Sequence, residues 1–179
     1  MLFRSSPDLM HKTDAGGLIL NLADEASVRR AYDTLHAAAK ERAPAAAIDG
    51  VLVQEMVSGV EFLVGMHRDP ILGPVVVVSP GGIFVELFDN AAERRLPPFD
   101  KSEAETMISR SKTAEKLLGG FRGRPRADRA ALVKLIGDFA ALVARLGDDV
   151  AAIDLNPVMV LPEGKGAKIV DAAIEFAPS

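Results

Sequence analysis

Two oxygen-bearing side chains lie two residues apart near the carboxyl end of the chain. The segment reads Asp154-Leu155-Asn156-Pro157 and follows a long amphipathic helix pattern. Residues i and i+2 of a strand point to the same face, and Mg²⁺ takes oxygen ligands while sharing its site with substrate phosphates. The pair therefore suits a Mg²⁺ site used in nucleotide chemistry. The alternative is a strand that ends in a turn, where Asx side chains bond the local backbone.

A second group of chemically capable residues lies near the amino end. An imidazole, an ammonium, a carboxylate and two glycines occur together at His11, Lys12, Asp14, Gly16 and Gly17. A neutral imidazole can accept a phosphoryl group, a lysine can offset its charge, and glycine amides can hold phosphate oxygens. The segment is therefore either a phosphoryl-transfer loop or a solvated polar loop that precedes a strand.

A third segment has the form of an adenine-binding hinge. The apolar stretch 50–57 contains Gln54, Glu55 and Met56 near its end, and Glu61 follows after a glycine turn. Backbone groups at a strand end can bond the adenine edge, and a nearby carboxylate can accept hydrogen bonds from ribose hydroxyls. The alternative is an ordinary hairpin between this strand and the next.

The composition excludes several classes of function. The chain has 179 residues, a formal net charge of −4, no cysteine, no tryptophan and one tyrosine. Because it lacks a basic surface and stacking aromatics, we expect no nucleic-acid partner and no anionic membrane partner. Disulfides and thiolate metal sites are excluded, which suits a cytoplasmic protein. No apolar run approaches the ~20 residues of a spanning helix.

The elements that must position these residues follow from hydrophobic periodicity and turn signals. We expect an α+β fold, with a mostly antiparallel or mixed sheet covered by helices. A capping box is expected at Ser102 and Glu105. Helices are expected at 24–40, 102–110 and 128–146, with a helical turn ending at 119–120. Strands are expected at 50–57, 62–66, 74–79, 83–88, 150–161 and 168–176.

Taken in order, these segments resemble the ATP-grasp domain of the NDP-forming acyl-CoA synthetases, the β-type half of ADP-forming acetate–CoA ligase. The resemblance covers nearly the whole chain, and the order and spacing of its blocks make it specific. The matching blocks are Ser6-Pro7-Asp8 with 11–17, Val51–Met56 with Glu61, Asp69-Pro70 with Gly73-Pro74, 81–86, 122–125, 154–157 and Val170-Asp171-Ala172.

The resemblance implies that Mg²⁺ and ATP or ADP are held between two α+β lobes. The reaction it implies is acyl-CoA + ADP + phosphate ⇌ carboxylic acid + CoA + ATP, through an acyl phosphate and a phosphohistidine. By resemblance, His11 carries the phosphate, and Glu61 contacts the ribose. The metal ligands would be Asp154 and Asn156. The expected nucleotide-binding residues are Lys12, Asp14, Gly16, Gly17, Gln54, Glu55, Met56 and Glu61.

The resemblance also implies a division of the chain and a partner. Residues 1–47 would be the remainder of the small ATP-grasp lobe, and residues 48–179 the main lobe. The lysine usual on a strand before Ser6 is replaced by the segment Leu2–Ser5, so the small lobe is expected to be incomplete. We therefore expect a ligase component that is inactive alone and works with a CoA-binding α-type domain or subunit. Association of the chain with further copies of itself is left as a second possibility.

The alternative function is a non-catalytic module. Similar ATP-grasp domains are attached to some protein acetyltransferases, where they regulate or scaffold. Two features favour this alternative, Phe3 in the segment that replaces the usual lysine and Asn90 in place of the usual aspartate. Such a module would bind nucleotide without transferring phosphate, or would do neither.

Overall fold

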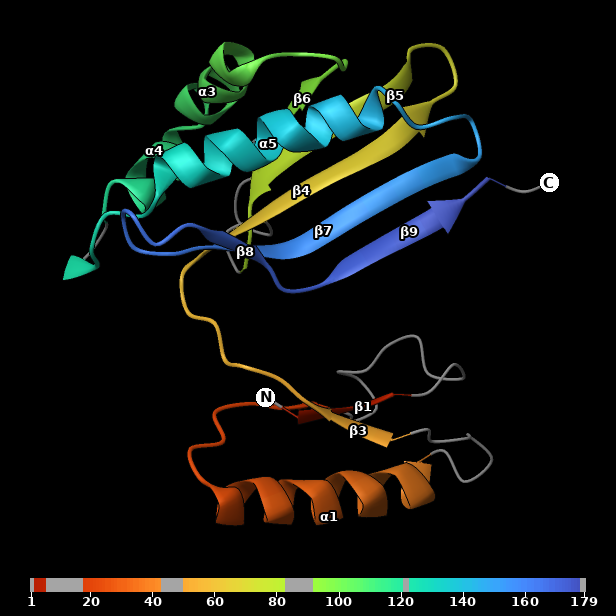
Figure 1. Ribbon diagram of the computed structural model, residues 1–179, viewed down its shortest axis with the longest axis vertical. Coiled ribbons are helices and arrows are strands. Elements are labelled where there is room, and N and C mark those ends of the chain that lie inside the picture. Colours follow the sequence, from red (N-terminus) through yellow and green to blue (C-terminus); the bar gives the residue numbers. More distant parts are fainter. Residues whose placement is uncertain (1, 6–17, 43–49, 83–91, 121–122, 178–179) are drawn as a thin grey trace. The chain divides into compact units, whose positions relative to one another are not determined.

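The chain folds into two compact units, Met1–Met56 and Val57–Ser179. The computed structural model describes residues 2–5, 18–42, 50–82, 92–120 and 123–177 (Figure 1). Both units combine helices with antiparallel strands, which confirms the predicted α+β class. Within the described ranges, no helix has the length and apolar character needed to cross a membrane.

The first unit packs one helix on a small sheet. The strands lie in the order β2-β1-β3. The elements are β1 (Leu2–Ser5), β2 (Leu18–Ile19), α1 (Glu25–Arg42) and β3 (Gly50–Val53). The Asp24 carboxylate accepts a hydrogen bond from the Ser27 amide at 2.6 Å, and Ala31 and Leu35 are buried on one face of α1. The predicted helix is confirmed, because an N-cap and an apolar stripe specify it locally.

The structure excludes the alternative of an ordinary hairpin between the expected strand 50–57 and the next strand. β3 ends at Val53 instead of Val57 and pairs with β1, with Leu52 opposite Phe3. β4 (Val60–Asp69) pairs with β5 and β7 instead. A β-branched stretch identifies an extended segment but not its partner, which is set by contacts far away in the sequence.

The second unit is built on a six-stranded antiparallel sheet. Its strands lie in the order β6-β5-β4-β7-β8, and β9 also pairs with β7. The remaining strands are β5 (Gly73–Pro80), β6 (Glu93–Arg95), β7 (Val150–Val160), β8 (Ala167–Ile169) and β9 (Ala172–Phe176). The carboxylate of Asp69 accepts hydrogen bonds from the amides of Ile71 and Leu72, which closes the turn between β4 and β5.

Three helices cover one face of this sheet, and α5 runs along β4 and β7 (Figure 1). They are α3 (Lys101–Arg110), α4 (Lys112–Leu118) and α5 (Arg129–Val143). Phe62 and Val64 of β4 are fully buried in one hydrophobic core cluster with Leu132 and Ile136 of α5. The Arg129 guanidinium bonds the carboxylates of Glu105 in α3 and Glu115 in α4, so one side chain ties the three helices together. The other face of the sheet carries no helix among the described residues.

Two local predictions in this unit are wrong. The N-cap of α3 is Asp100, whose carboxylate accepts from the Glu103 amide at 3.0 Å, so the expected Ser102 capping box does not form. The expected strand 168–176 is two strands, β8 and β9, because Val170 and Asp171 belong to neither of them. The strand expected at 83–88 lies outside the described residues.

Candidate functional site

The face of the sheet opposite the helices presents Asp154 and Asn156. On β7 they are exposed, whereas Ile153 before them and Leu155 between them are buried on the helix side. The alternation follows from the period of two in a strand. The structure therefore places the two expected metal ligands on one face, on the strand that the sequence predicts. Their role as ligands stays a prediction.

A β-bulge shapes β7 at these residues. Leu155 pairs with Val64 and Val158 pairs with Phe62, so two residues of β7 oppose the single residue Leu63. Bulges re-aim side chains and are common beside binding sites. The bulge is also held on the side of β7 away from β4, where the Asn156 amide donates a hydrogen bond to the Asp171 carbonyl at 3.1 Å.

Gly65 keeps the space beside Asp154 open. It lies directly opposite Asp154 on β4. A Cβ at Gly65 would lie 3.0 Å from the Ile153 carbonyl oxygen and 3.8 Å from Oδ1 of Asp154. A larger side chain would therefore fill the place where a ligand of the carboxylate has to sit. The sequence analysis did not single out this glycine, although a glycine within a strand marks close approach of a ligand or backbone.

Asp154 and Asn156 could supply two of the oxygen ligands of Mg²⁺ but not a complete coordination shell. Carboxylate and amide oxygens are the ligands that a hard cation prefers. Among the described residues there is no cluster of three or more histidines, cysteines or acids that could hold a metal by itself. A cation here would therefore take its other ligands from water and phosphate, which is the usual mode for Mg²⁺.

Glu61 lies on the same face, at the start of β4. Its carbonyl accepts from the Gly81 amide at 2.7 Å. Gly82 has φ +67°, and a Cβ there would lie 2.8 Å from Oε2 of Glu61. The turn after β5 therefore needs glycine, both for its backbone conformation and for its close approach to this carboxylate.

A hollow of about 450 Å³ adjoins Glu61 within the second unit. Its wall is mostly apolar, with a carboxylate at Glu61 and a guanidinium at Arg124. The lining residues are Val57–Glu61, Arg124, Pro125, Ala127, Met159, Val160 and Pro162. An apolar hollow with a few polar groups suits a planar base and its sugar. Sequence reasoning missed Met159, because only the pairing of β7 with β4 brings it opposite Glu61.

One carboxylate holds the border of this hollow in place. Asp128 accepts hydrogen bonds from the Gly166 amide at 2.8 Å and from the Ala131 amide at 3.0 Å. These bonds lower the pKa of the Asp128 carboxyl below its usual value, the bond from Gly166 most. Asp128 thus caps α5 and fastens the turn after Pro162 at the same time.

The other expected site residues are placed only in part. Gln54, Glu55 and Met56 follow β3 in the first unit, in a segment without regular secondary structure. Gln54 is half-buried, whereas Glu55 and Met56 are exposed. His11, Lys12, Asp14, Gly16 and Gly17 lie outside the described residues. The roles of all eight residues stay predictions.

Comparison with known proteins identifies the family. The sequence pattern of the ATP-grasp domain matches residues 3–176. The chain is 39% identical to a 4-hydroxybutyrate–CoA ligase (ADP-forming) of Nitrosopumilus maritimus over 95% of its own length, and spans 24% of that protein. It is 36% identical to the beta subunit of acetate–CoA ligase (ADP-forming) II of Pyrococcus furiosus, covering 94% of this chain and 71% of that subunit.

Solved structures agree with this result. The dinucleotide-forming acetyl-coenzyme A synthetase 1 of Ca. Korarchaeum cryptofilum, in complex with coenzyme A and Ca-AMPCP, superposes with a TM-score of 0.87 at 40% identity. The match covers 98% of this chain and 75% of that one. The same protein with coenzyme A and Mg-AMPPCP, its phosphohistidine segment pointing towards the nucleotide binding site, gives a TM-score of 0.80 at 34% identity, covering 98% of this chain and 76% of that one. The predicted ATP-grasp resemblance and fold are confirmed.

Proposed function

Because this chain belongs to the ATP-grasp domain family, we propose that it is the nucleotide-binding component of an NDP-forming acyl-CoA synthetase. The reaction is acyl-CoA + ADP + phosphate ⇌ carboxylic acid + CoA + ATP. The observation that carries the proposal is the pair Asp154 and Asn156, which the open sheet face presents opposite a glycine. A solved relative with this fold is described in complex with Mg-AMPPCP.

In this proposal the open sheet face holds the nucleotide phosphates. Asp154 and Asn156 would hold Mg²⁺, whose charge neutralises phosphate oxygens during phosphoryl transfer. Gly65 leaves room for the phosphates beside Asp154. Each residue acts through its position on a paired strand, so the site keeps its geometry when no ligand is bound.

The hollow beside Glu61 would take the nucleoside. Its apolar wall covers the base, and the Glu61 carboxylate accepts hydrogen bonds from ribose hydroxyls. Gln54, Glu55 and Met56 would contact the adenine edge. These assignments rest on the family motif and on the chemistry of the residues.

The amino-terminal motif would carry the phosphate. His11 is the proposed phosphohistidine, with Lys12, Asp14, Gly16 and Gly17 binding phosphate or nucleotide. The acyl and CoA chemistry requires a CoA-binding α-type domain or subunit, since this chain spans only 24% of the 4-hydroxybutyrate–CoA ligase to which it is similar. We place the complex in the cytoplasm, in keeping with the absence of cysteine.

Calorimetric titration with ADP and ATP, with and without Mg²⁺, tests nucleotide binding. Asp154→Ala should weaken Mg²⁺-dependent binding about tenfold or more, because a direct carboxylate ligand is lost. Asp148→Ala is the matched control, since that carboxylate is fully exposed and pairs only with Arg68 among the described residues. Equal binding by the Asp154 variant and the unchanged chain would contradict the metal assignment.

Labelled phosphate tests the transfer step. With acyl-CoA, phosphate and the CoA-binding partner supplied, we expect acid-labile label on the unchanged chain and none on His11→Ala. Label that persists in this variant would remove the assigned role of His11. Nucleotide binding without any label would instead support a regulatory module.

A further inference from the structure

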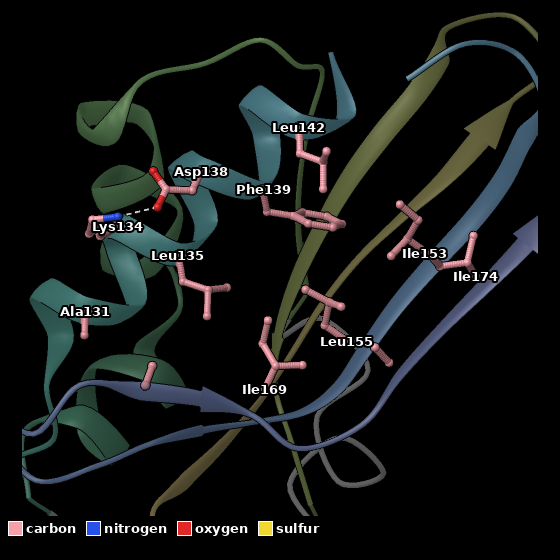
Figure 2. A pocket seen from close by; sticks show the side chains of 12 residues that line it. Ala131, Lys134, Leu135, Asp138, Phe139, Leu142, Ile153, Leu155, Ile169 and Ile174 are labelled. Carbon is pink, nitrogen blue, oxygen red and sulfur yellow. Dashed lines mark hydrogen bonds and ion pairs between the residues drawn. The ribbon is translucent and has the colours of Figure 1, made fainter. Parts of the chain in front are cut away.

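Two hollows of the second unit differ in what their charged side chains contact. The groove between α5 and the strands β7, β8 and β9 has Lys134 and Asp138 in its lining, and these two side chains bond each other at 2.5 Å (Figure 2). The hollow beside Glu61 is lined by Glu61 and Arg124 instead. Among the residues that the structure describes, neither the Glu61 carboxylate nor the Arg124 guanidinium has a hydrogen bond or an ion pair. Both charges of this hollow are therefore available to a ligand.

The backbone on both sides of Arg124 is held in place. After α4, Gly120 has φ +91°, and a Cβ there would lie 2.7 Å from the Arg124 carbonyl oxygen, so the two backbones are in close contact. On the other side, the Arg126 carbonyl accepts a hydrogen bond from the Glu163 amide at 2.9 Å. The Arg124 side chain is exposed on this fixed backbone. The fold therefore sets the position of Arg124 before a ligand binds.

The proposed nucleotide site has a direction along β4 and β7. Asp154 lies opposite Gly65, and Met159 lies opposite Glu61. Successive residues of a strand are about 3.3 Å apart, so Glu61 lies about 13 Å along β4 from Gly65. With the phosphates at Asp154 and the ribose at Glu61, the base has to lie beyond Glu61. The hollow extends in that direction, along residues 57–60.

We propose that Arg124 binds the base of the nucleotide, with its guanidinium packed on the face of the purine ring. This inference rests on the proposed function, from which it takes the positions of the phosphates and the ribose. A guanidinium is planar, always charged and weakly hydrated, so it stacks well on aromatic rings. Such a contact uses the face of the base and leaves its edge to other donors and acceptors.

A phosphate contact is the other common role of an arginine. The order of the site disfavours it here, because the phosphates lie toward Gly65 and the hollow that Arg124 lines extends from Glu61 in the opposite direction. The two roles predict different losses. An arginine on the base affects ligands that contain a base, whereas an arginine on phosphate also affects inorganic pyrophosphate.

Calorimetric titration with ADP, GDP and inorganic pyrophosphate, all with Mg²⁺, tests the proposal. Arg124→Gln should weaken the binding of ADP and GDP by about tenfold each, because stacking does not read the edge of the base. It should leave pyrophosphate binding unchanged. Arg124→Lys keeps the charge without the plane and should lose part of the affinity. Arg126→Gln is the matched control, since Arg126 is exposed but does not line the hollow.

The same titrations distinguish failure of this inference from failure of the proposed function. Mg²⁺-dependent ADP binding that is equal in Arg124→Gln and the unchanged chain overturns the role of Arg124 and leaves the nucleotide site standing. Equal losses for ADP and pyrophosphate assign Arg124 to phosphate and also overturn it. An unchanged chain that binds neither ADP nor pyrophosphate overturns the proposed function together with this inference.

Discussion

The two faces of the central sheet use the same strands for opposite purposes. On β4, Phe62 and Val64 are fully buried under α5, whereas Glu61 on the other face is exposed. On β7, the buried Leu155 is followed by the exposed Asn156. The helix face supplies burial and so fixes the register, because a shift by one residue would reverse every side chain. The polar face can then carry a binding site at positions that the core already determines.

Removing a large buried side chain from the helix face should test most strongly whether the two faces have different roles. Phe62→Ala should lower the free energy of unfolding by about 3–5 kcal/mol, because it leaves a cavity in a fully buried site. Leu63→Ala, next in the strand and half-buried on the open face, is the matched control and should cost clearly less. Chemical denaturation measures both values. Equal losses would show that both faces contribute to the core.

A change on the open face should affect binding at a smaller cost in stability. Gly65→Val places a side chain against the Ile153 carbonyl and beside Asp154. We expect the Mg²⁺-dependent affinity for ADP to fall about tenfold, and the free energy of unfolding to fall by about 1–3 kcal/mol from overpacking. Calorimetry well below the melting temperature separates the two effects. Undiminished binding would mean that the phosphates lie elsewhere.

The smallest expected effect concerns Asp128, which caps α5 on the helix face and also holds the turn before β8. Asp128→Ala removes the N-cap of α5 and the bond to Gly166, which should cost about 1–2 kcal/mol at pH 7. Because the folded pKa of Asp128 lies below its usual value, this stabilisation is complete above the unfolded pKa of about 4 and is lost as pH falls through the folded pKa.

Thermal melts of the unchanged chain and this variant, recorded from pH 7 to pH 3, measure that loss. The difference between the two should shrink on acidification. A difference that stays constant with pH would show that the charge of Asp128 contributes nothing, while Asp148→Ala should show almost no difference at either pH because that carboxylate is fully exposed.

The sequence by itself determined the local elements and the family. Helical spacing and the cap at Asp24 specify α1, and the apolar stripe after Asp128 specifies α5. In each helix the cap and the apolar positions lie close together in the sequence, so local patterns are sufficient to predict it. The order of short motifs along the chain was sufficient for the ATP-grasp resemblance. Alternation on β7 likewise placed Asp154 and Asn156 on one face.

Only the tertiary structure decided which segments meet. The pairing of β3 with β1, the opposition of Gly65 and Asp154, and the bulge opposite Leu63 join residues far apart in the sequence. The hollow beside Glu61 likewise depends on the pairing of β4 with β7, which brings Met159 opposite Glu61. Local propensity predicts that a segment forms a strand. The partner and register of that strand depend instead on which apolar faces can be buried together.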